Sequence, residues 1–222
     1  MQSVDRVFDK TVAEYQDLLA PAILRVWDNE VQNLRWDIHG WIRQLAESKE
    51  GWIPKWFELS FGLRSSTAPA VVLPNGMLVR GAIDMVEEND GKLRITDHKT
   101  GKPQPPFGFT RNGEVLQPLL YAQAAETVLG KPAVATRLFY STQRAGYKVD
   151  EIAVTEEGRE YLAKVIELID ESLSQGFLPA APREEACKYC DYRIVCGPNE
   201  ERRLRIKKTD RLRLLEQLRS IP

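Results

Sequence analysis

Cysteine is missing from most of the sequence. The first 186 residues contain none, and all three cysteines, Cys187, Cys190 and Cys196, lie within ten residues of one another. Three thiols cannot all pair as disulfides, which excludes the small disulfide-stapled scaffolds. A chain of 222 residues is long enough to bury a core without such cross-links.

Long apolar runs and a strong net charge are also missing. No apolar run approaches the roughly 18 residues that a membrane span requires, and residues 1–10 lack the apolar stretch of a signal peptide. The net charge is −1 and 28% of the residues are charged, which excludes disordered, fibrous and membrane classes. We therefore expect a cytoplasmic protein that does not associate with membranes.

Helical periodicity dominates residues 1–50. Apolar residues recur at steps of three and four from Trp27 to Leu45, which predicts a helix whose apolar stripe packs against a substantial partner. A second helix is predicted before Pro21. We expect one structural domain with a helical segment at 1–50, a core at 51–182, and a cysteine segment with a basic C-terminal helix at 183–222.

A period of two begins after Trp52. Phe57, Leu59 and Phe61 alternate with polar residues, the pattern of a half-buried strand. Residues 89–91 predict a turn between two further strands, and a loop rich in proline and glycine follows at 101–113. Helical and strand patterns then alternate, so the sequence predicts an α/β fold.

Two carboxylates and a lysine occur at the ends of the predicted strands. Residues two apart on a strand share a face, so Asp97 and Lys99 point the same way, and Asp84 lies on the preceding strand of the hairpin. By itself such a pair is usually an exposed ion pair that contributes little to stability. Here an apolar stripe leads directly into the charges, which favours a site that holds Mg²⁺ or Mn²⁺ for phosphodiester hydrolysis.

These motifs give the sequence its family resemblance. Gly81-Ala82-Ile83-Asp84, then Asp97-His98-Lys99-Thr100-Gly101, then Gln117-Pro118-Leu119-Leu120-Tyr121 occur in order. The chain thus resembles the PD-(D/E)xK nuclease superfamily, in particular its RecB/AddB-like branch, which includes CRISPR-associated exonucleases. The resemblance covers about residues 52–196. It implies a restriction-endonuclease-like core, a mixed β-sheet flanked by helices.

The resemblance also implies roles for individual residues. Asp84 and Asp97 would be metal ligands together with the backbone carbonyl of His98, and Lys99 would be the catalytic lysine. Gln117 and Tyr121 would share a helix face that borders the active site and contacts DNA. The alternative interpretation of these two residues is ordinary packing against the sheet. Lys102 and Arg111 in the long loop could join them on the phosphates.

Two further metal ligands are weaker candidates. Glu58 is out of phase with the apolar residues of its strand, so a solvent-facing side chain is the simplest interpretation, although the family places an acidic residue near this point. His39 is the candidate for the family's first-helix histidine. Its position beside the apolar stripe favours a partly exposed helix histidine instead.

The cysteine spacing is a second family mark. In the family, three C-terminal cysteines spaced like Cys187, Cys190 and Cys196 join one N-terminal cysteine to hold a [4Fe–4S] cluster. The present sequence has no N-terminal cysteine. Two explanations stay open: the chain begins downstream of the fourth ligand, or it is a variant with a degenerate cluster or with Zn²⁺.

The expected function is metal-dependent DNA cleavage, of exonuclease type, in repair or recombination. DNA is the expected partner, and a helicase, recombination or CRISPR protein is a candidate second partner. The segment after Cys196 carries eight Lys or Arg against four acids and could track phosphates or form the solvated face of an amphipathic helix. The alternative function is an inactive nuclease-fold module that binds DNA or a helicase.

Overall fold

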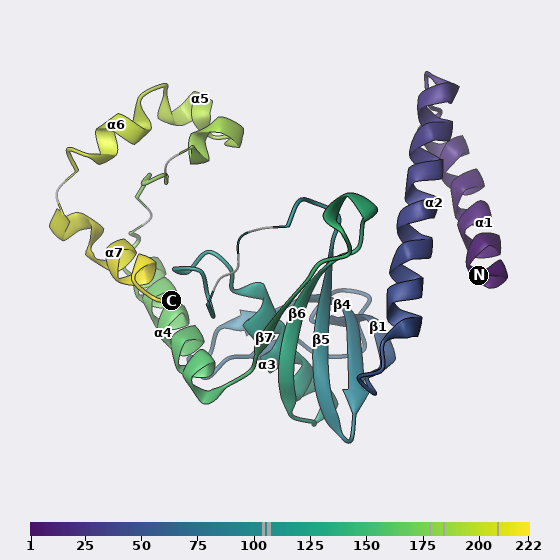
Figure 1. Cartoon of the computed structure of the whole chain (residues 1–222). Helices are drawn as coiled ribbons and strands as arrows, with labels where there is room; N and C mark the ends of the chain where they lie inside the picture. Colours follow the sequence, from purple (N-terminus) through teal and green to yellow (C-terminus); the bar gives the residue numbers. More distant parts are fainter. Residues whose placement is uncertain (104, 106–107, 178, 184, 208) are drawn as a thin grey trace. The chain divides into compact units, whose positions relative to one another are not determined.

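The predicted acidic residues lie on a five-stranded mixed sheet (Figure 1). Its strand order is β1 (Ile53–Phe61), β4 (Gly81–Asn89), β5 (Lys92–Lys99), β6 (Ala133–Tyr140) and β7 (Val149–Ala153). We describe the protein from a computed structural model, which describes residues 1–222 apart from 104, 106–107, 178, 184 and 208. The chain divides into two compact units. The first comprises residues 1–71, 80–106 and 121–154, and the second comprises residues 72–79, 107–120 and 155–222.

The first unit contains two long helices, the sheet and most of helix α3. Its elements are α1 (Gln2–Leu19), α2 (Leu24–Glu47), β1 (Ile53–Phe61), β4 (Gly81–Asn89), β5 (Lys92–Lys99), α3 (Gln117–Leu129), β6 (Ala133–Tyr140), the 3-10 turn η1 (Gln143–Ala145) and β7 (Val149–Ala153). Helix α3 begins in the second unit and continues into the first. The predicted α/β fold, with a mixed sheet flanked by helices, is confirmed.

The β4–β5 hairpin is the centre of the sheet. Asp90 and Gly91 both adopt positive φ, at 47° and 75°, which matches the two-residue turn expected there. Strand β5 runs antiparallel to β4 and parallel to β6. Val86, Leu93 and Ile95 are buried, so the two strands contribute side chains to the hydrophobic core.

Strand β1 departs from the predicted alternation. Phe57 was expected to point inward, yet its side chain is 61% exposed, whereas Phe61 is fully buried. The backbone of β1 is irregular on both sides of Phe57: the register with β4 shifts between Pro54 and Trp56, and Glu58 adopts a left-handed φ of 49°. The predicted inward position of Phe57 is therefore wrong, although the strand itself is present.

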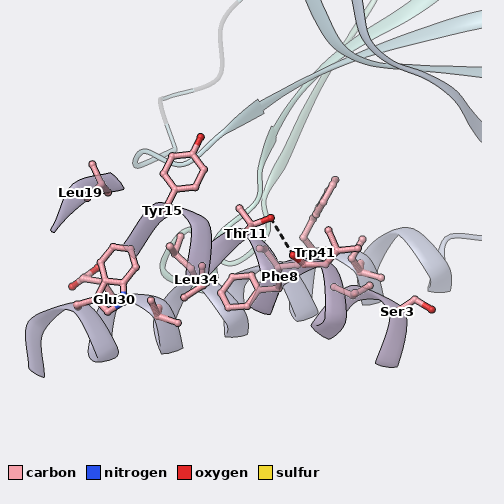
Figure 2. A pocket seen from close by; sticks show the side chains of 15 residues that line it. Ser3, Phe8, Thr11, Tyr15, Leu19, Glu30, Leu34 and Trp41 are labelled. Carbon is pink, nitrogen blue, oxygen red and sulfur yellow. Dashed lines mark hydrogen bonds between the residues drawn. The ribbon is translucent and has the colours of Figure 1, made fainter. Parts of the chain in front are cut away.

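Helices α1 and α2 form a hairpin whose apolar stripes line a groove of about 690 Å³ (Figure 2). The stripe predicted in α2 is present and faces α1, although neither helix contains a fully buried residue. Ion pairs of Arg35 with Asp5 and Asp9 join the two helices. The hairpin is therefore held by polar contacts beside a loosely filled apolar interior.

Helix α2 also contacts the sheet. Its Gly40 lies against Tyr147, and a Cβ at this position would come within 1.8 Å of the Tyr147 hydroxyl. Asp37 accepts a hydrogen bond from the backbone N–H of Gln143 at 2.7 Å, and the Trp41 ring meets the His98 ring edge-on at 4.9 Å. These contacts place α2 next to the strand that carries the Asp-x-Lys motif.

The second unit has its own core around helix α4. Its elements are β3 (Leu78–Val79), α4 (Glu156–Ser174), η2 (Ala186–Tyr189), α5 (Arg193–Cys196), α6 (Glu200–Leu204), η3 (Thr209–Leu212) and α7 (Arg213–Arg219), and the short strand β2 (Val71–Val72) falls at the boundary between the units. Thr155 caps α4 by accepting a hydrogen bond from the Gly158 N–H. Leu162 and Ile166 pack with Leu73 and Leu119, while Val165 packs against Leu214 and Ile221 in a second cluster.

The C-terminal segment is not one helix. The expected basic helix is divided into α6, η3 and α7, and its cations are partly neutralised. Arg203 and Lys207 pair with Glu200, and Arg213 pairs with Glu171 at 3.1 Å; Lys208 lies outside the described residues. Across the described part of the chain, no helix combines the length and the hydrophobicity needed to traverse a bilayer.

Candidate active site

Asp97 and Lys99 lie on the same face of strand β5, as predicted. The Lys99 Nζ is 2.5 Å from the Asp97 Oδ2. The Asp97 side chain is only 7% exposed, whereas that of Lys99 is 38% exposed, so the pair joins a buried carboxylate to an accessible ammonium. The ammonium supplies the close counter-charge of a carboxylate that would otherwise be costly to bury.

Asp84 reaches β5 from the neighbouring strand. Its Oδ2 accepts a hydrogen bond of 2.6 Å from the backbone N–H of His98 and lies 3.7 Å from the His98 Nδ1. The motif residues Asp84, Asp97, His98 and Lys99 therefore meet where β4 and β5 separate. Sequence reasoning expected this meeting from the hairpin topology.

Electrostatics at this point disfavour one of the two negative charges. Burial raises the pKa of Asp97, Lys99 opposes that shift, and the neighbouring Asp84 charge adds to it. Burial also lowers the pKa of His98, against the pull of the Asp84 carboxylate. Holding two carboxylate charges close together at a partly buried site has an electrostatic cost, and a bound cation would offset it.

The donor set fits a hard divalent cation. Asp84 and Asp97 offer carboxylate oxygens and His98 offers a backbone carbonyl, the ligand types that Mg²⁺ takes together with several waters. In the described ranges no group of three or more His, Cys, Asp or Glu side chains could hold a metal ion. The protein would therefore contribute two side chains and a backbone oxygen.

Comparison with known proteins decides the family. Residues 1–197 match the PD-(D/E)XK nuclease superfamily, a region that includes every residue of the site just described. The chain belongs to the PD-(D/E)XK nuclease superfamily.

Two phage proteins are similar to this PD-(D/E)XK chain. The Gene 69 protein of Mycobacterium phage D29 is 30% identical over 125 residues, which is 55% of this chain and 44% of the phage protein. The Gene 69 protein of Mycobacterium phage L5 is 27% identical over 136 residues, 58% of this chain and 44% of that protein. The matched region thus spans less than half the length of these relatives.

Other candidate residues differ in how close the structure places them to the carboxylates. The backbone of Glu58 lies opposite Asp84, between the ladder pairs Phe57–Met85 and Leu59–Ile83, and its side chain is exposed. Its role as a ligand stays a prediction. The left-handed φ at Glu58 was invisible to the sequence pattern.

The helix residues share α3 as predicted. Gln117 is its first residue, and Tyr121 lies one turn later with its ring edge-on to Phe61 at 6.5 Å. The Tyr121 ring also approaches Gly81, three residues before Asp84. DNA contact by Gln117 and Tyr121 stays a prediction.

His39 has a partner away from the carboxylates. Its Nε2 is 2.7 Å from the Asp5 Oδ1, so it joins the α1–α2 hairpin. The bond to His39 is also the main reason why the pKa of Asp5 is lowered. His39 is thus a partly exposed helix histidine paired with Asp5 on α1, and its role as a metal ligand stays a prediction.

The loop cations and the cysteines stay predictions as binding residues. Lys102 is exposed in the loop after β5, and Arg111 belongs to the second unit, where its φ of 47° is left-handed. Cys187 and Cys196 are half-buried and Cys190 is exposed; no disulfide joins them, and within the described residues they do not form a group that could hold a metal ion.

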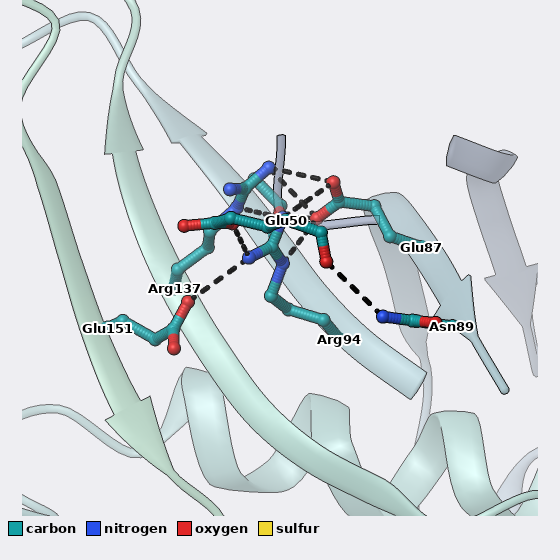
Figure 3. A network of polar contacts seen from close by, with 7 residues as sticks. Glu50, Glu87, Asn89, Arg94, Arg137 and Glu151 are labelled. Carbon is teal, nitrogen blue, oxygen red and sulfur yellow. Dashed lines mark hydrogen bonds and ion pairs between the residues drawn. The ribbon is translucent and has the colours of Figure 1, made fainter. Parts of the chain in front are cut away.

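A buried charged network on β4, β5 and β6 was missed by sequence reasoning (Figure 3). Glu87 accepts hydrogen bonds from Arg94, Thr96 and Arg137, at distances of 3.0 to 3.1 Å. Arg94 also pairs with Glu50 at 2.5 Å and Glu151 at 3.5 Å. The sequence feature that could have indicated this network is the presence of arginines inside otherwise apolar strands, because a buried charge requires an opposite charge or hydrogen-bond partner.

Proposed function

We propose that this chain is a Mg²⁺- or Mn²⁺-dependent deoxyribonuclease that hydrolyses phosphodiester bonds at Asp84, Asp97 and Lys99. The observation that carries the proposal is the meeting of two carboxylates and an ammonium at the ends of adjacent strands, with Asp97 buried against Lys99. A bound divalent cation would polarise the phosphoryl oxygen and lower the pKa of a water.

The chain's own groups have distinct tasks in this proposal. Asp84 and Asp97 hold the cation, and the His98 N–H orients the Asp84 carboxylate through its hydrogen bond. Lys99 is accessible enough to meet a phosphate, where its ammonium would stabilise negative charge that develops in the transition state. With Lys99 turned toward the phosphate, Asp97 would need another counter-charge, which a bound cation would supply.

The test is a cleavage assay with single- and double-stranded DNA in Mg²⁺ or Mn²⁺. Asp84→Asn and Lys99→Met should each lower the cleavage rate by about a hundredfold or more, because each removes a charge that acts on the transition state. Asn can still accept the His98 N–H, so the first variant tests charge rather than shape. The proposal fails if these variants cut as fast as the wild type.

Asp90→Asn is the matched control for this assay. It removes a carboxylate from the turn of the same β4–β5 hairpin, and asparagine tolerates the left-handed φ found there. The control should cut at the wild-type rate. Equal loss in Asp90→Asn would point to hairpin stability rather than to the site.

The finer assignment is exonuclease-type action in DNA repair or recombination, in the RecB/AddB-like branch, beside a helicase or CRISPR partner. The support for it is the order of the three sequence motifs. Matched linear and closed circular DNA test the exonuclease assignment. Degradation of both forms at the same rate would contradict it.

A catalytically inactive module that binds DNA or a helicase is the second candidate. It is favoured by one observation: across the described residues no three ligating side chains form a metal site. This candidate predicts DNA binding that is independent of Mn²⁺ and unchanged in Asp84→Asn.

The cysteine segment carries a separate proposal, a [4Fe–4S] cluster or Zn²⁺ held by Cys187, Cys190 and Cys196. Its support is their sequence spacing alone, because among the described residues these side chains do not form a group that could hold a metal ion. Iron and zinc analysis after anaerobic purification tests it. A stable protein that contains neither metal would contradict both forms of the proposal.

A further inference from the structure

Three hydrogen-bonded side chains link β4, β5 and β6: Glu87, Thr96 and Arg137. The Thr96 hydroxyl donates to the Glu87 Oε2 at 3.0 Å and accepts from the Arg137 Nε at 2.6 Å. Glu87 and Arg137 also meet directly, at 3.0 Å between Oε1 and Nη2 (Figure 3). All three residues are buried, and Thr96 is fully inaccessible.

Thr96 occupies the last regular pair of the β4–β5 ladder. The pairing runs from Asn89–Lys92 to Met85–Thr96 and stops there. The residues that follow on the two strands are Asp84 and Asp97. The separation of these carboxylates is therefore set by what holds the strands at their final pair, and by the bond from the His98 N–H to Asp84.

On its other edge, β5 pairs with β6 over a longer stretch than it pairs with β4. Its parallel pairing with β6 continues through Asp97–Leu138 to Lys99–Tyr140. The strand segment that carries Asp97 is thus fixed to β6, while its position relative to β4 depends on the end of the ladder. The hydrogen bonds of Thr96 join β4, β5 and β6 at the place where the β4–β5 ladder ends.

Thr96 does not belong to the carboxylate site itself. Side chains alternate along a strand, so Thr96 faces away from Asp97 and Lys99 and shares its face with Arg94. Its influence on the site passes through the backbone at positions 96–98, while the charges of Glu87 and Arg137 also act on the pKa of the neighbouring His98 ring.

We propose that Thr96, held between Glu87 and Arg137, is a positioning residue that sets β5 against β4 so that the His98 N–H meets Asp84 and the two carboxylates form one site. The consequence for cation binding rests on the proposed function. The consequence for the His98–Asp84 hydrogen bond does not.

The experiment compares Thr96→Val with Thr96→Ser in the full chain. Valine keeps the shape and removes the hydroxyl, whereas serine keeps the hydroxyl. Thr136→Val is the matched control: Thr136 is 1% exposed on β6, and its hydroxyl makes no hydrogen bond to any described residue. Arg137→Met is a second variant that removes the other end of the chain of contacts.

The first readout is amide hydrogen exchange of the metal-free protein. Loss of about one net hydrogen bond should speed exchange of the His98 amide by about fivefold to tenfold in Thr96→Val. The Leu93 amide, which donates to the Pro132 carbonyl at the other end of β5, should exchange as in the wild type. Thr96→Ser should restore the slow rate and Thr136→Val should keep it.

The second readout is the dissociation constant of Mn²⁺ measured by calorimetry. It should rise by about fivefold in Thr96→Val and return toward the wild-type value in Thr96→Ser. If the wild type binds no Mn²⁺, the proposed function fails, while the His98 exchange rate still decides the positioning role.

A merely structural role predicts a different pattern. Thr96→Val and Arg137→Met would then lower the melting temperature and speed His98 and Leu93 exchange equally, or leave His98 exchange unchanged. Either result overturns the proposal.

Discussion

Strand β5 carries a different charged cluster on each of its faces. The closed cluster comprises Glu87, Arg94, Thr96 and Arg137, and the open cluster comprises Asp84, Asp97 and Lys99. In the closed cluster every charge is buried, and the Glu87 carboxylate accepts hydrogen bonds from three different residues. In the open cluster Asp97 is buried against Lys99, and Asp84 and Lys99 are about one-third exposed.

The difference between the clusters lies in how well their charges are compensated. Glu87 has two arginines around it, so its negative charge is matched within the protein. Asp97 has one lysine and a second carboxylate beside it, and its pKa is raised by burial and by Asp84. A satisfied buried network fixes strands in place, whereas an under-compensated one retains an electrostatic cost that a cation would remove.

The largest expected effect is the loss of the closed cluster. Glu87→Gln leaves Arg94 and Arg137 buried with less counter-charge, so it should lower the free energy of unfolding by about 3–5 kcal/mol. Denaturant unfolding followed by circular dichroism measures this change. Glu88→Gln is the control on the same strand; it should cost clearly less than Glu87→Gln, because Glu88 pairs with the more exposed Lys55 and Lys131.

Equal costs for Glu87→Gln and Glu88→Gln would break the comparison. The closed cluster would then contribute no more to stability than a pair of surface ion pairs, and it could not hold β4, β5 and β6 as we infer.

A smaller effect of opposite sign is expected in the open cluster. Asp97→Asn removes a buried carboxylate whose pKa is raised, so it should raise the melting temperature of the metal-free protein by a few degrees. Calorimetric melting with a chelator present measures this shift. The same variant should lose cleavage activity.

The pH dependence of this shift follows from the sign of the pKa change. Folding favours the protonated form of Asp97, so the stability that this group contributes is present below the ordinary aspartate pKa of 3.8 and is lost as the pH rises through the raised value. The gain from Asp97→Asn should therefore be full near neutral pH and vanish toward pH 3.8. A gain that grows on acidification would contradict the raised pKa.

The open cluster was largely predictable from the sequence, and the closed cluster was not. The turn residues Asp90 and Gly91 and the two-residue spacing of Asp97 and Lys99 depend on local backbone geometry, which a strand pattern encodes directly. Arg94 lies directly opposite Glu87 in the β4–β5 hairpin, but Arg137 reaches Glu87 only after β6 has been placed parallel to β5, a pairing between segments about 40 residues apart. Periodicity within one strand contains no information about that pairing.

The failures of prediction have local causes as well. Phe57 is exposed on a strand with irregular backbone on both sides of it, at Pro54–Trp56 and at Glu58, and the C-terminal segment forms short helices where one was expected. The apolar stripe of α2 was read correctly as a pattern, yet it lines a groove with α1 and contains no buried residue. Sequence periodicity identifies an apolar face but does not show how completely that face is covered.

The central claim is that the open cluster is a cation site, and calorimetric titration of the metal-free protein with Mn²⁺ tests it most directly. We expect the wild type and Asp90→Asn to bind Mn²⁺ alike, and we expect Asp84→Asn and Asp97→Asn to lose that binding, because each removes a carboxylate ligand. Absence of Mn²⁺ binding by the wild type, or unchanged binding by Asp84→Asn and Asp97→Asn, would contradict the claim.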